Sequence, residues 1–327
     1  MSKIIEFKNI SKDFKILTKK KGKGFFNLFR RDKQIIHALS DINFEIEEGD
    51  IVGYIGPNGA GKSTTIKIMS GILTPTSGEC TIMGQIPWKD RKKYVKNIGV
   101  VFGQRSQLWW DVPIIDSFQL LKDIYKIPTA EYKETLNELI ETLNLHDLLN
   151  RPLRQLSLGQ KMKCELAGSL LHRPKVLFLD EPTIGLDAIT KLAVRDFIKS
   201  INKKWGTTII LTTHDMNDID ALTNKIILIG RGQILYRGSF SAIKEKYGHI
   251  KDISVEFAKN YEKISLKGYK VISHNKNMAT LRNNQEKPFH VKDFFEAITK
   301  KYEVVDFQVN SISVDEILAQ LYTELKL

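Results

Sequence analysis

The sequence predicts an α/β domain built on a mostly parallel sheet, with an inserted helical subdomain, and a small α+β domain after it. Strand-sized apolar segments separated by helical patterns indicate the parallel sheet, at residues 51–55, 176–179, 208–212 and 225–229. A helical pattern at residues 116–149 indicates the insertion. After Gly238 the pattern changes to short strands and then two helices, with the strands at residues 253–257, 270–273 and 278–281. We therefore expect one domain at residues 1–240 and an accessory domain at residues 241–327.

The N-terminal part contains two strand patterns and a strongly basic insert. A strand pattern covers residues 3–7, and a second begins near Ile42. The insert lies between them, at about residues 18–34. Its residues 19–33 carry seven basic side chains and one acid around an apolar group, Phe25, Phe26, Leu28 and Phe29.

Helix boundaries follow from breakers and periodicity. A helical pattern at residues 62–72 stops at the Thr, Pro, Ser and Gly cluster of residues 74–78. The helical subdomain is expected at about residues 105–172, where apolar residues recur at i, i+3, i+4 and i+7, namely Leu136, Leu139, Ile140 and Leu143. Its last helix opens on a capping box formed by Ser157 and Gln160 and runs to His172.

The composition is that of a globular protein, with 42% of the 327 residues hydrophobic and 27% charged. No apolar run approaches the roughly 18 residues of a membrane span, and the N-terminus lacks the pattern of a secretory signal. Cys80 and Cys164 stand far apart without a Cys/His cluster, so neither a disulfide nor a metal site is indicated. We therefore expect a cytoplasmic protein. The net charge of +12 fits nucleic acid, an anionic membrane surface or simple solubility.

A glycine-rich loop joins the strand at residues 51–55 to the helix that follows. It fits GxxxxGK[ST] in full, the pattern of a phosphate-binding loop, whose backbone N–H groups and helix N-terminus bind phosphates. Lys62 is expected to reach the β- and γ-phosphates, and Ser63 to hold Mg²⁺. A glycine-rich turn that happens to contain Lys-Ser is the alternative, and the strand-to-helix context argues against it. The expected binding set is Gly56, Pro57, Asn58, Gly59, Ala60, Gly61, Lys62, Ser63 and Thr64.

Two carboxylates, Asp180 and Glu181, follow the apolar strand at residues 176–179. In a doubly wound sheet the carboxyl ends of the strands face the ligand crevice. Asp180 is therefore expected to bind the Mg²⁺ shell, and Glu181 to polarise the attacking water. Acids after a strand are commonly a solvated turn, but the phosphate loop in the same chain favours the functional interpretation.

Five motifs in a fixed order give the chain its resemblance to the ATP-binding-cassette (ABC) ATPases. They are GPNGAGKS, LSLGQ, VLFLDEP, Gly185-Leu186-Asp187 and the His214 that follows the strand TTIILTT. Order and spacing match over about residues 4–238. LSLGQ departs from the family's LSGGQ at Leu158, which puts local contact with nucleotide in doubt, whereas Ser157, Gly159 and Gln160 stand as in the family.

The resemblance implies ATP and Mg²⁺ as ligands and a nucleotide held between two subunits. ATP would lie on the phosphate loop of one subunit and against the Ser157 helix N-terminus of the other, in a homodimer or a heterodimer with a related subunit. Gln104 would be the switch glutamine that touches Mg²⁺ and water. His214 would contact the γ-phosphate, and Asp187 would communicate across the dimer. Phe14 falls where the family has an aromatic ring stacked on adenine, and an ordinary core Phe is the alternative.

The same resemblance implies that this chain powers an ABC transporter through separate multi-span permease subunits, at the inner face of the cell membrane. Trp109 and Trp110 lie where the family faces the permease, with a core aromatic pair as the alternative. The insert fits a lipid headgroup boundary, a membrane subunit or a solvated loop. The accessory domain and the ending at residues 313–318 resemble ABC-2-type exporters, although Ser313 and Glu316 are also a capping box.

Two other functions compete with the transport motor. A non-transport ABC ATPase acting on nucleic acid or ribosomes suits the charge, but its relatives carry paired cassettes or long coiled coils, which are absent from this sequence. A different P-loop class, such as a kinase, does not explain LSLGQ. We expect no nucleic-acid partner.

Overall fold

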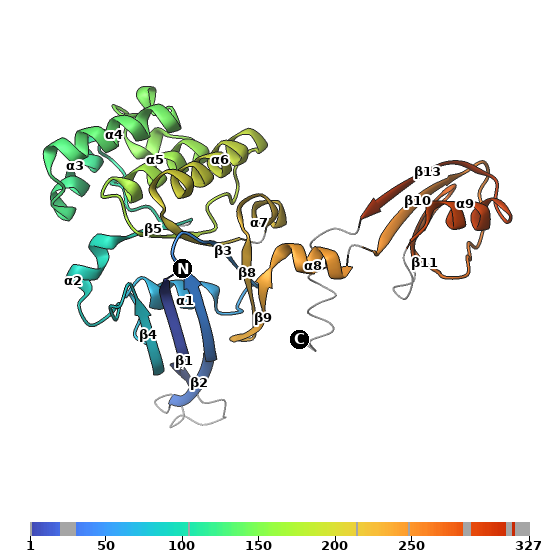
Figure 1. The fold of residues 1–327 in the computed structure, drawn as a ribbon, viewed down its shortest axis with the longest axis horizontal. Coiled ribbons are helices and arrows are strands. Elements are labelled where there is room, and N and C mark those ends of the chain that lie inside the picture. The colour runs from blue at the N-terminus through green and yellow to red at the C-terminus, as the bar shows by residue number, and fades with distance from the viewer. Residues whose placement is uncertain are drawn as a thin grey trace. The chain divides into compact units, whose positions relative to one another are not determined.

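The computed structural model describes residues 2–19, 31–103, 105–213, 215–247, 249–283, 289–311 and 316–317. The chain divides into two compact units, Met1–Gly238 and Ser239–Leu327 (Figure 1). Each unit has its own cluster of buried apolar side chains. Within the described residues no helix is long and apolar enough to cross a membrane.

A six-stranded, mainly parallel sheet forms the centre of the first unit. Its order is β5 (Ile98–Phe102), β6 (Val176–Asp180), β7 (Thr208–Thr212), β3 (Ile51–Ile55), β8 (Lys225–Gly230) and β9 (Gln233–Ser239). The pairs from β5 to β8 are parallel, and their residues are almost all buried, which explains the continuous apolar runs. The register aligns Phe102 with Asp180, and Asp180 with Thr212. The carboxyl ends of these strands therefore meet at one edge.

Helices and a second sheet cover the parallel sheet. On one side lie α1 (Lys62–Met69) and an antiparallel sheet of β2 (Arg31–Glu47), β1 (Lys3–Lys19) and β4 (Ser77–Ile82), and on the other side lie α5 (Leu158–Leu170) and α6 (Ala188–Trp205) (Figure 1). The short helices α2 (Arg91–Tyr94) and α7 (Met216–Leu222) complete the unit. The helix predicted at residues 62–72 ends earlier, before Gly71, whose φ of 70° is left-handed.

The first two strands correct the expected extent of the basic insert. Pairing of β1 with β2 continues as far as Lys19 opposite Arg31, so both flanks of the stretch predicted as an insert at residues 18–34 are strand. Register shifts between Phe7 and Asp13 interrupt the alternation of apolar and polar residues, which is why the strand pattern stopped at residue 7. Phe25, Phe26, Leu28 and Phe29 lie outside the described residues.

The helical subdomain contains α3 (Ile114–Tyr125), α4 (Thr129–Leu143) and α5, with 3₁₀ turns at His146–Leu148 and Leu153–Gln155. The pattern at residues 116–149 thus resolves into separate helices, because Lys126 is left-handed and Pro128 follows. The expected apolar stripe is buried, from Leu136 to Leu143. The capping box at the start of α5 is confirmed.

Strand β5 was not anticipated from the sequence, because Gly99 weakens its strand pattern. A Cβ at Gly99 would lie 2.6 Å from the backbone oxygen of Ser169 in α5. The glycine therefore permits the close approach of helix and sheet rather than marking a turn. β4 was missed for a related reason, since it begins at Ser77 inside the breaker cluster.

The second unit is an antiparallel sheet with a helix packed against it. The strands run in the order β11 (Tyr269–Asn275), β12 (Met278–Asn283), β10 (Lys251–Phe257) and β13 (Val304–Ser311). α8 (Phe240–Tyr247) precedes them, and α9 (Val291–Thr299) buries Phe294 and Ile298. β13 is a correction to the expected series of three strands followed by two helices. Ser313 of the predicted capping box lies outside the described residues.

Candidate nucleotide-binding site

The phosphate loop is shaped by two neighbouring strands. A Cβ at Gly56 would lie 2.3 Å from the backbone oxygen of Ile229 in β8. Gly61 has a left-handed φ of 111°, and a Cβ there would lie 2.9 Å from the backbone oxygen of Ala38 in β2. Close packing therefore requires glycine at both positions, and the left-handed backbone at Gly61 is a second reason there. The loop leads directly into α1, whose N-terminus carries free backbone N–H groups suited to an anion.

Lys62 is buried inside this loop, with 7% of the residue exposed. Its Nζ donates to the carbonyl oxygens of Gly56 at 2.6 Å and Pro57 at 3.2 Å. Burial lowers the pKa of Lys62, and the nearby carboxylates of Glu181 and Asp180 oppose that shift. The ammonium group is thus held where phosphate oxygens can replace the two carbonyls.

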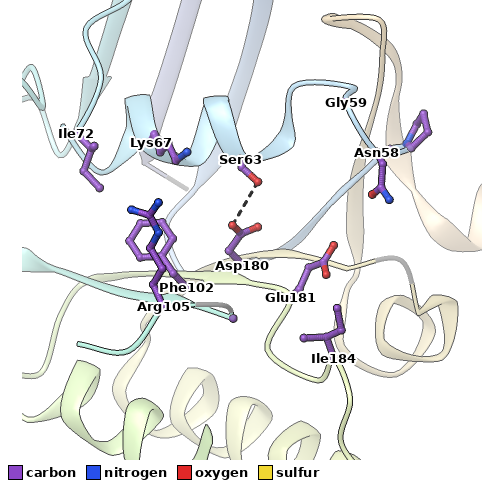
Figure 2. A pocket seen from close by; sticks show the side chains of 13 residues that line it. Asn58, Gly59, Ser63, Lys67, Ile72, Phe102, Arg105, Asp180, Glu181 and Ile184 are labelled. Atoms are coloured by element: carbon purple, nitrogen blue, oxygen red, sulfur yellow. Dashed lines mark hydrogen bonds between the residues drawn. The ribbon is translucent and has the colours of Figure 1, made fainter. Parts of the chain in front are cut away.

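Asp180 connects three elements at the edge of the sheet. Its Oδ2 accepts from Ser63 Oγ at 3.3 Å, and its Oδ1 accepts from Thr212 Oγ1 at 2.6 Å. Its backbone oxygen accepts from Gly103 N–H at 2.8 Å. Figure 2 shows Asp180 directed at Ser63, with the Glu181 side chain beside it, on the side of Asn58. Two of the three side chains predicted to bind Mg²⁺, Ser63 and Asp180, are therefore together.

Glu181 leaves the sheet in a left-handed backbone conformation, with φ of 55°. Its N–H is anchored by the Thr212 carbonyl oxygen at 3.0 Å. This conformation is uncommon for residues other than glycine and is typical of functional positions. The half-buried carboxylate lines the same pocket as the phosphate loop.

The pocket has a volume of about 850 Å³. One wall is the phosphate loop, with Gly56, Pro57, Asn58, Gly59 and Ser63, and Asp180 and Glu181 form another. The rest of the lining is Lys67, Ile72, Phe102, Gly103, Arg105 and Ile184. Lys67 and Arg105 add positive charge that sequence reasoning missed, because a single basic residue outside a motif carries no signal.

Only some of the residues predicted to bind nucleotide or Mg²⁺ line this pocket. Ala60, Gly61, Lys62 and Thr64 belong to the same loop and helix without lining it, and Phe14 is half-buried on β1, opposite Ile36. Gln104 and His214 lie outside the described residues. The LSLGQ motif, from here on the signature segment, does not line the pocket and lies at the N-terminus of α5. The segment that ends at Asp187 lies at the N-terminus of α6, and Asp187 is not in the lining either.

The signature segment and the Asp187 segment are neighbours within the chain. Asp187 caps α6 by accepting from Thr190 N–H at 2.9 Å and Thr190 Oγ1 at 2.7 Å, and these bonds lower the pKa of Asp187. A Cβ at Gly159 would lie 2.8 Å from Thr190 Cγ2, and one at Gly185 would lie 2.8 Å from Leu158 Cδ2. Leu158 is 48% exposed. The two helix N-termini therefore present a single surface.

Two buried carboxylates outside the motifs hold the site's loops. Asp218 of α7 accepts from Thr183 Oγ1, from Thr213 Oγ1 at 3.1 Å and from Arg195 Nε at 2.6 Å. Its bonds tie the segment after Glu181 to the segment before residue 214. The only sequence signal for Asp218 is a carboxylate in a helix that also buries Ile219 and Leu222.

Glu165 of α5 is the second such carboxylate. It accepts from Ser106 Oγ and from Gln107 N–H at 3.2 Å. Burial raises the pKa of Glu165, and these hydrogen bonds oppose the shift. Glu165 thus joins the signature helix to the segment that follows residue 104.

The residues present fit Mg²⁺. The Ser63 hydroxyl and the Asp180 carboxylate are hard oxygen donors, which Mg²⁺ prefers, and a bound phosphate and water would complete its shell. Across the part of the chain that the structure describes, no group of three or more His, Cys, Asp or Glu could hold a metal by itself. The donor set therefore suits a metal that arrives with nucleotide.

Comparison with known proteins identifies the family. A model described as ABC transporter matches residues 39–184. The ABC transporter ATP-binding protein NatA of Bacillus subtilis (strain 168) is 31% identical over 66% of this chain and 88% of NatA. ABC transporter A family member 8 of Dictyostelium discoideum is 35% identical over 73% of this chain, which spans 28% of that longer protein.

A solved structure agrees with these relatives. The dimeric, post-hydrolysis state of the ATP-binding cassette MJ0796, bound to ADP and Pi, matches with a TM-score of 0.59 and 27% identity. The match covers 72% of this chain and 98% of that chain. The fold is therefore that of an ABC ATPase cassette, and the chain belongs to the family of ABC transporter ATP-binding proteins.

Proposed function

We propose that the chain binds MgATP in the pocket between the phosphate loop and β6 and hydrolyses it to drive a transporter. The observation that carries this proposal is the convergence of Lys62, Ser63, Asp180 and Glu181 from α1 and the end of β6. Lys62 would leave its two backbone acceptors for the phosphates, and Ser63 and Asp180 would hold Mg²⁺. Glu181 would accept the proton of the attacking water as general base. Gln104 and His214 are proposed to complete the site.

The active unit is proposed to be a dimer. Three signature residues, Ser157, Gly159 and Gln160, share a surface with the capping residue Asp187 and do not line the pocket of their own chain. MJ0796 is dimeric with ADP and Pi bound. A second subunit would therefore bring these residues to the nucleotide, and hydrolysis would reopen the pair.

The permease-facing surface is proposed to lie on the helical subdomain. Trp109 and Trp110 are 41% and 55% exposed, so they are not a core pair. Leu120 and Ile124 of α3 are 42% and 59% exposed and stand four residues apart on one helix face. Exposed aromatic and aliphatic side chains of this kind are typical of protein interfaces. The chain would then work from the cytoplasm, peripheral to the membrane.

The direction of transport is proposed to be export, of the ABC-2 type. Support comes from the separate unit Ser239–Leu327 and from the resemblance of the ending at residues 313–318. Once a permease and its substrate are known, inside-out vesicles separate the directions. ATP-driven accumulation inside them means export, whereas accumulation in right-side-out vesicles means import and overturns this part of the proposal.

The decisive experiment is purification with ATP from detergent-solubilised native membranes, using tagged full-length Glu181→Gln. Loss of the general base should trap the closed, ATP-bound dimer together with its partner. The matched control is Glu181→Gln combined with Lys62→Ala, which should bind ATP much more weakly and so recover less of the partner at a limiting ATP concentration. Recovery of a multi-span membrane protein with the first variant supports the proposal. Recovery of ribosomes or nucleic acid alone would overturn it.

A further inference from the structure

The charges that line the nucleotide pocket are divided between its two sides. Asp180 and Glu181 are the carboxylates of the lining, and Lys67 and Arg105 are its cations. In Figure 2 Glu181 lies on the side of Asn58, whereas the two cations lie on the other side of Asp180, with the Arg105 guanidinium directed at α1. Neither cation has an ion pair or a side-chain hydrogen bond among the residues that the structure describes. One side of the pocket therefore carries two positive charges that no described carboxylate pairs with.

Lys67 is placed by the helix that follows the phosphate loop. Ser63 and Lys67 are four residues apart in α1, and both line the pocket, whereas the three residues between them do not. Residues at this spacing lie on one face of a helix, about 6 Å apart along its axis. Lys67 therefore stands one turn beyond the hydroxyl group that is proposed to hold Mg²⁺. A phosphate that moved along α1 away from the metal would meet its ammonium group.

Arg105 is placed by anchors on both sides of it in the chain. Before it, Gly103 N–H donates to the Asp180 backbone oxygen at 2.8 Å. After it, the Glu165 carboxylate of α5 accepts from Gln107 N–H at 3.2 Å, and the Glu165 backbone oxygen accepts from Gln107 Nε2 at 3.0 Å. The backbone around Arg105 is thus held to β6 and to α5, while its side chain stays exposed. Little backbone therefore has to be ordered when the guanidinium binds an anion.

We propose that Lys67 and Arg105 form a second phosphate subsite, which receives the inorganic phosphate that hydrolysis releases beside Ser63 and Asp180. The source of the phosphate rests on the proposed function, whereas the affinity of the subsite for phosphate does not. Arginine presents a planar fork of donors that matches phosphate oxygens, and lysine adds a point charge. Glu181, on the other side of the pocket, repels a phosphate dianion, so the electrostatic field favours movement toward the two cations.

A carboxylate on a partner protein would satisfy the same two charges. Phosphate fits better because both cations line the cavity in which hydrolysis would release it, and because its several oxygens can be shared between a guanidinium and an ammonium group. The subsite would lower the cost of separating phosphate from Mg²⁺, since the product exchanges one cation for two others.

The test is equilibrium dialysis of radiolabelled inorganic phosphate against the full-length chain, saturated with Mg²⁺ and a non-hydrolysable ATP analogue. The analogue fills the γ-phosphate position, so bound phosphate must occupy a different one. We expect a single phosphate to bind per chain. Lys67→Gln and Arg105→Gln should each weaken its binding about tenfold or more, and more than they weaken binding of the analogue. Arg105→Lys keeps the charge but loses the fork, so it should weaken binding less than Arg105→Gln.

Two exposed cations of α2 provide matched controls. Arg91→Gln and Lys92→Gln remove the same kinds of charge outside the pocket. Both should bind phosphate as the unchanged chain does. Cooperative urea unfolding of every variant shows that each one folds.

Absence of bound phosphate beside the analogue would overturn the proposal, and so would equal phosphate affinity in the pocket and control variants. Pocket variants that keep phosphate binding but recover less membrane protein in the Glu181→Gln purification would assign the two cations to a protein partner instead. Failure of the analogue to bind would count against the proposed function. Phosphate binding without nucleotide would then decide the subsite: dependence on Lys67 and Arg105 supports it, and independence overturns it.

Discussion

The Ser63 hydroxyl donates to the Asp180 carboxylate at 3.3 Å although the two residues are 117 positions apart in the chain. Ser63 lies in the first turn of α1 and Asp180 is the last residue of β6, so the contact joins the phosphate loop to the carboxyl end of β6. The fold itself therefore holds the Ser63 and Asp180 oxygen atoms, which would bind Mg²⁺, next to each other. Preorganisation of this kind reduces the cost of assembling the site on binding.

Asp180→Asn should weaken the use of Mg²⁺. The amide keeps the shape of the side chain and can still contact Ser63 and Thr212, but it loses the negative charge that attracts the cation. We expect the Mg²⁺ concentration for half-maximal ATPase activity to rise about tenfold or more. The measurement is a magnesium titration of ATPase activity, with the exposed Asp147→Asn as control. An unchanged titration would remove Asp180 from the metal site.

Lys62→Ala should lower the affinity for ATP, whose binding precedes Mg²⁺-dependent hydrolysis. The variant removes the one ammonium group that is buried in the phosphate loop, and a charge-assisted bond to phosphate is worth about 1.5–3 kcal/mol. We expect ATP affinity to fall about 10- to 100-fold, measured by equilibrium binding of a fluorescent ATP analogue. Lys89→Ala, at an exposed position, should bind normally. Normal affinity in the Lys62 variant would contradict its role.

Glu181→Gln should separate binding from hydrolysis. The amide cannot accept the proton of water, whereas the phosphate loop and Asp180 are unaffected. ATPase activity should fall about 10²- to 10⁴-fold, ATP affinity should persist, and sedimentation should show an ATP-dependent dimer. The exposed Glu141→Gln is the matched control. Rapid turnover by the Glu181 variant would assign the general base elsewhere.

Asp218→Ala should destabilise the first unit. The Asp218 side chain is fully buried and pairs with Arg195 Nη2 at 2.5 Å. Its removal leaves the largely buried guanidinium with only the more distant Asp215 carboxylate, at 3.7 Å, and takes the Asp218 acceptor from two hydroxyl groups. Breaking a buried pair in this way costs about 3–5 kcal/mol. Urea unfolding measures the loss. Asp196→Ala, exposed on the same helix as Arg195, should change stability by less than about 0.5 kcal/mol.

His172 should make stability fall in mild acid. Its ring stacks on Tyr125 with centroids 3.9 Å apart, and its Nε2–H donates to the Ile98 oxygen at 2.8 Å. Burial lowers the pKa of His172 from 6.5 to about 4, and the bond to Ile98 partly opposes this. In the unfolded chain the His172 ring binds a proton below about pH 6.5, whereas in the folded chain it stays neutral down to about pH 4. The free energy of unfolding therefore falls as the pH is lowered from about 6.5 to about 4.

We expect this group to cost about 1–2 kcal/mol of stability between pH 7 and pH 5. Urea unfolding at several pH values measures the slope. His172→Phe should flatten it, because no proton is taken up on unfolding, whereas the exposed His146→Gln should leave it unchanged. The same slope in both variants would mean that another group is responsible.

Much of the fold could be predicted because its signals are local. The predicted strands at residues 51–55 and 208–212 are confirmed as β3 and β7, since each is a run of five buried, mostly apolar residues, which is typical of a strand in a sheet covered on both faces. The strand β5 and the outer part of the β1–β2 hairpin were missed because Gly99 and the irregular register near Asn9 hide their patterns. Close packing and bulges are decided by partners distant in the chain.

The sequence by itself determined the chemistry of the site, because the phosphate loop and the Asp180-Glu181 pair are contiguous motifs with mechanisms of their own. Only the tertiary structure decided that Lys67 and Arg105 line the pocket and that Asp218 and Glu165 hold its loops. It also decided that the Lys67 and Arg105 side chains lie on the same side of Asp180 (Figure 2). The physical reason is that burial, hydrogen bonding and exposure depend on chain segments brought together by folding, which no local pattern records.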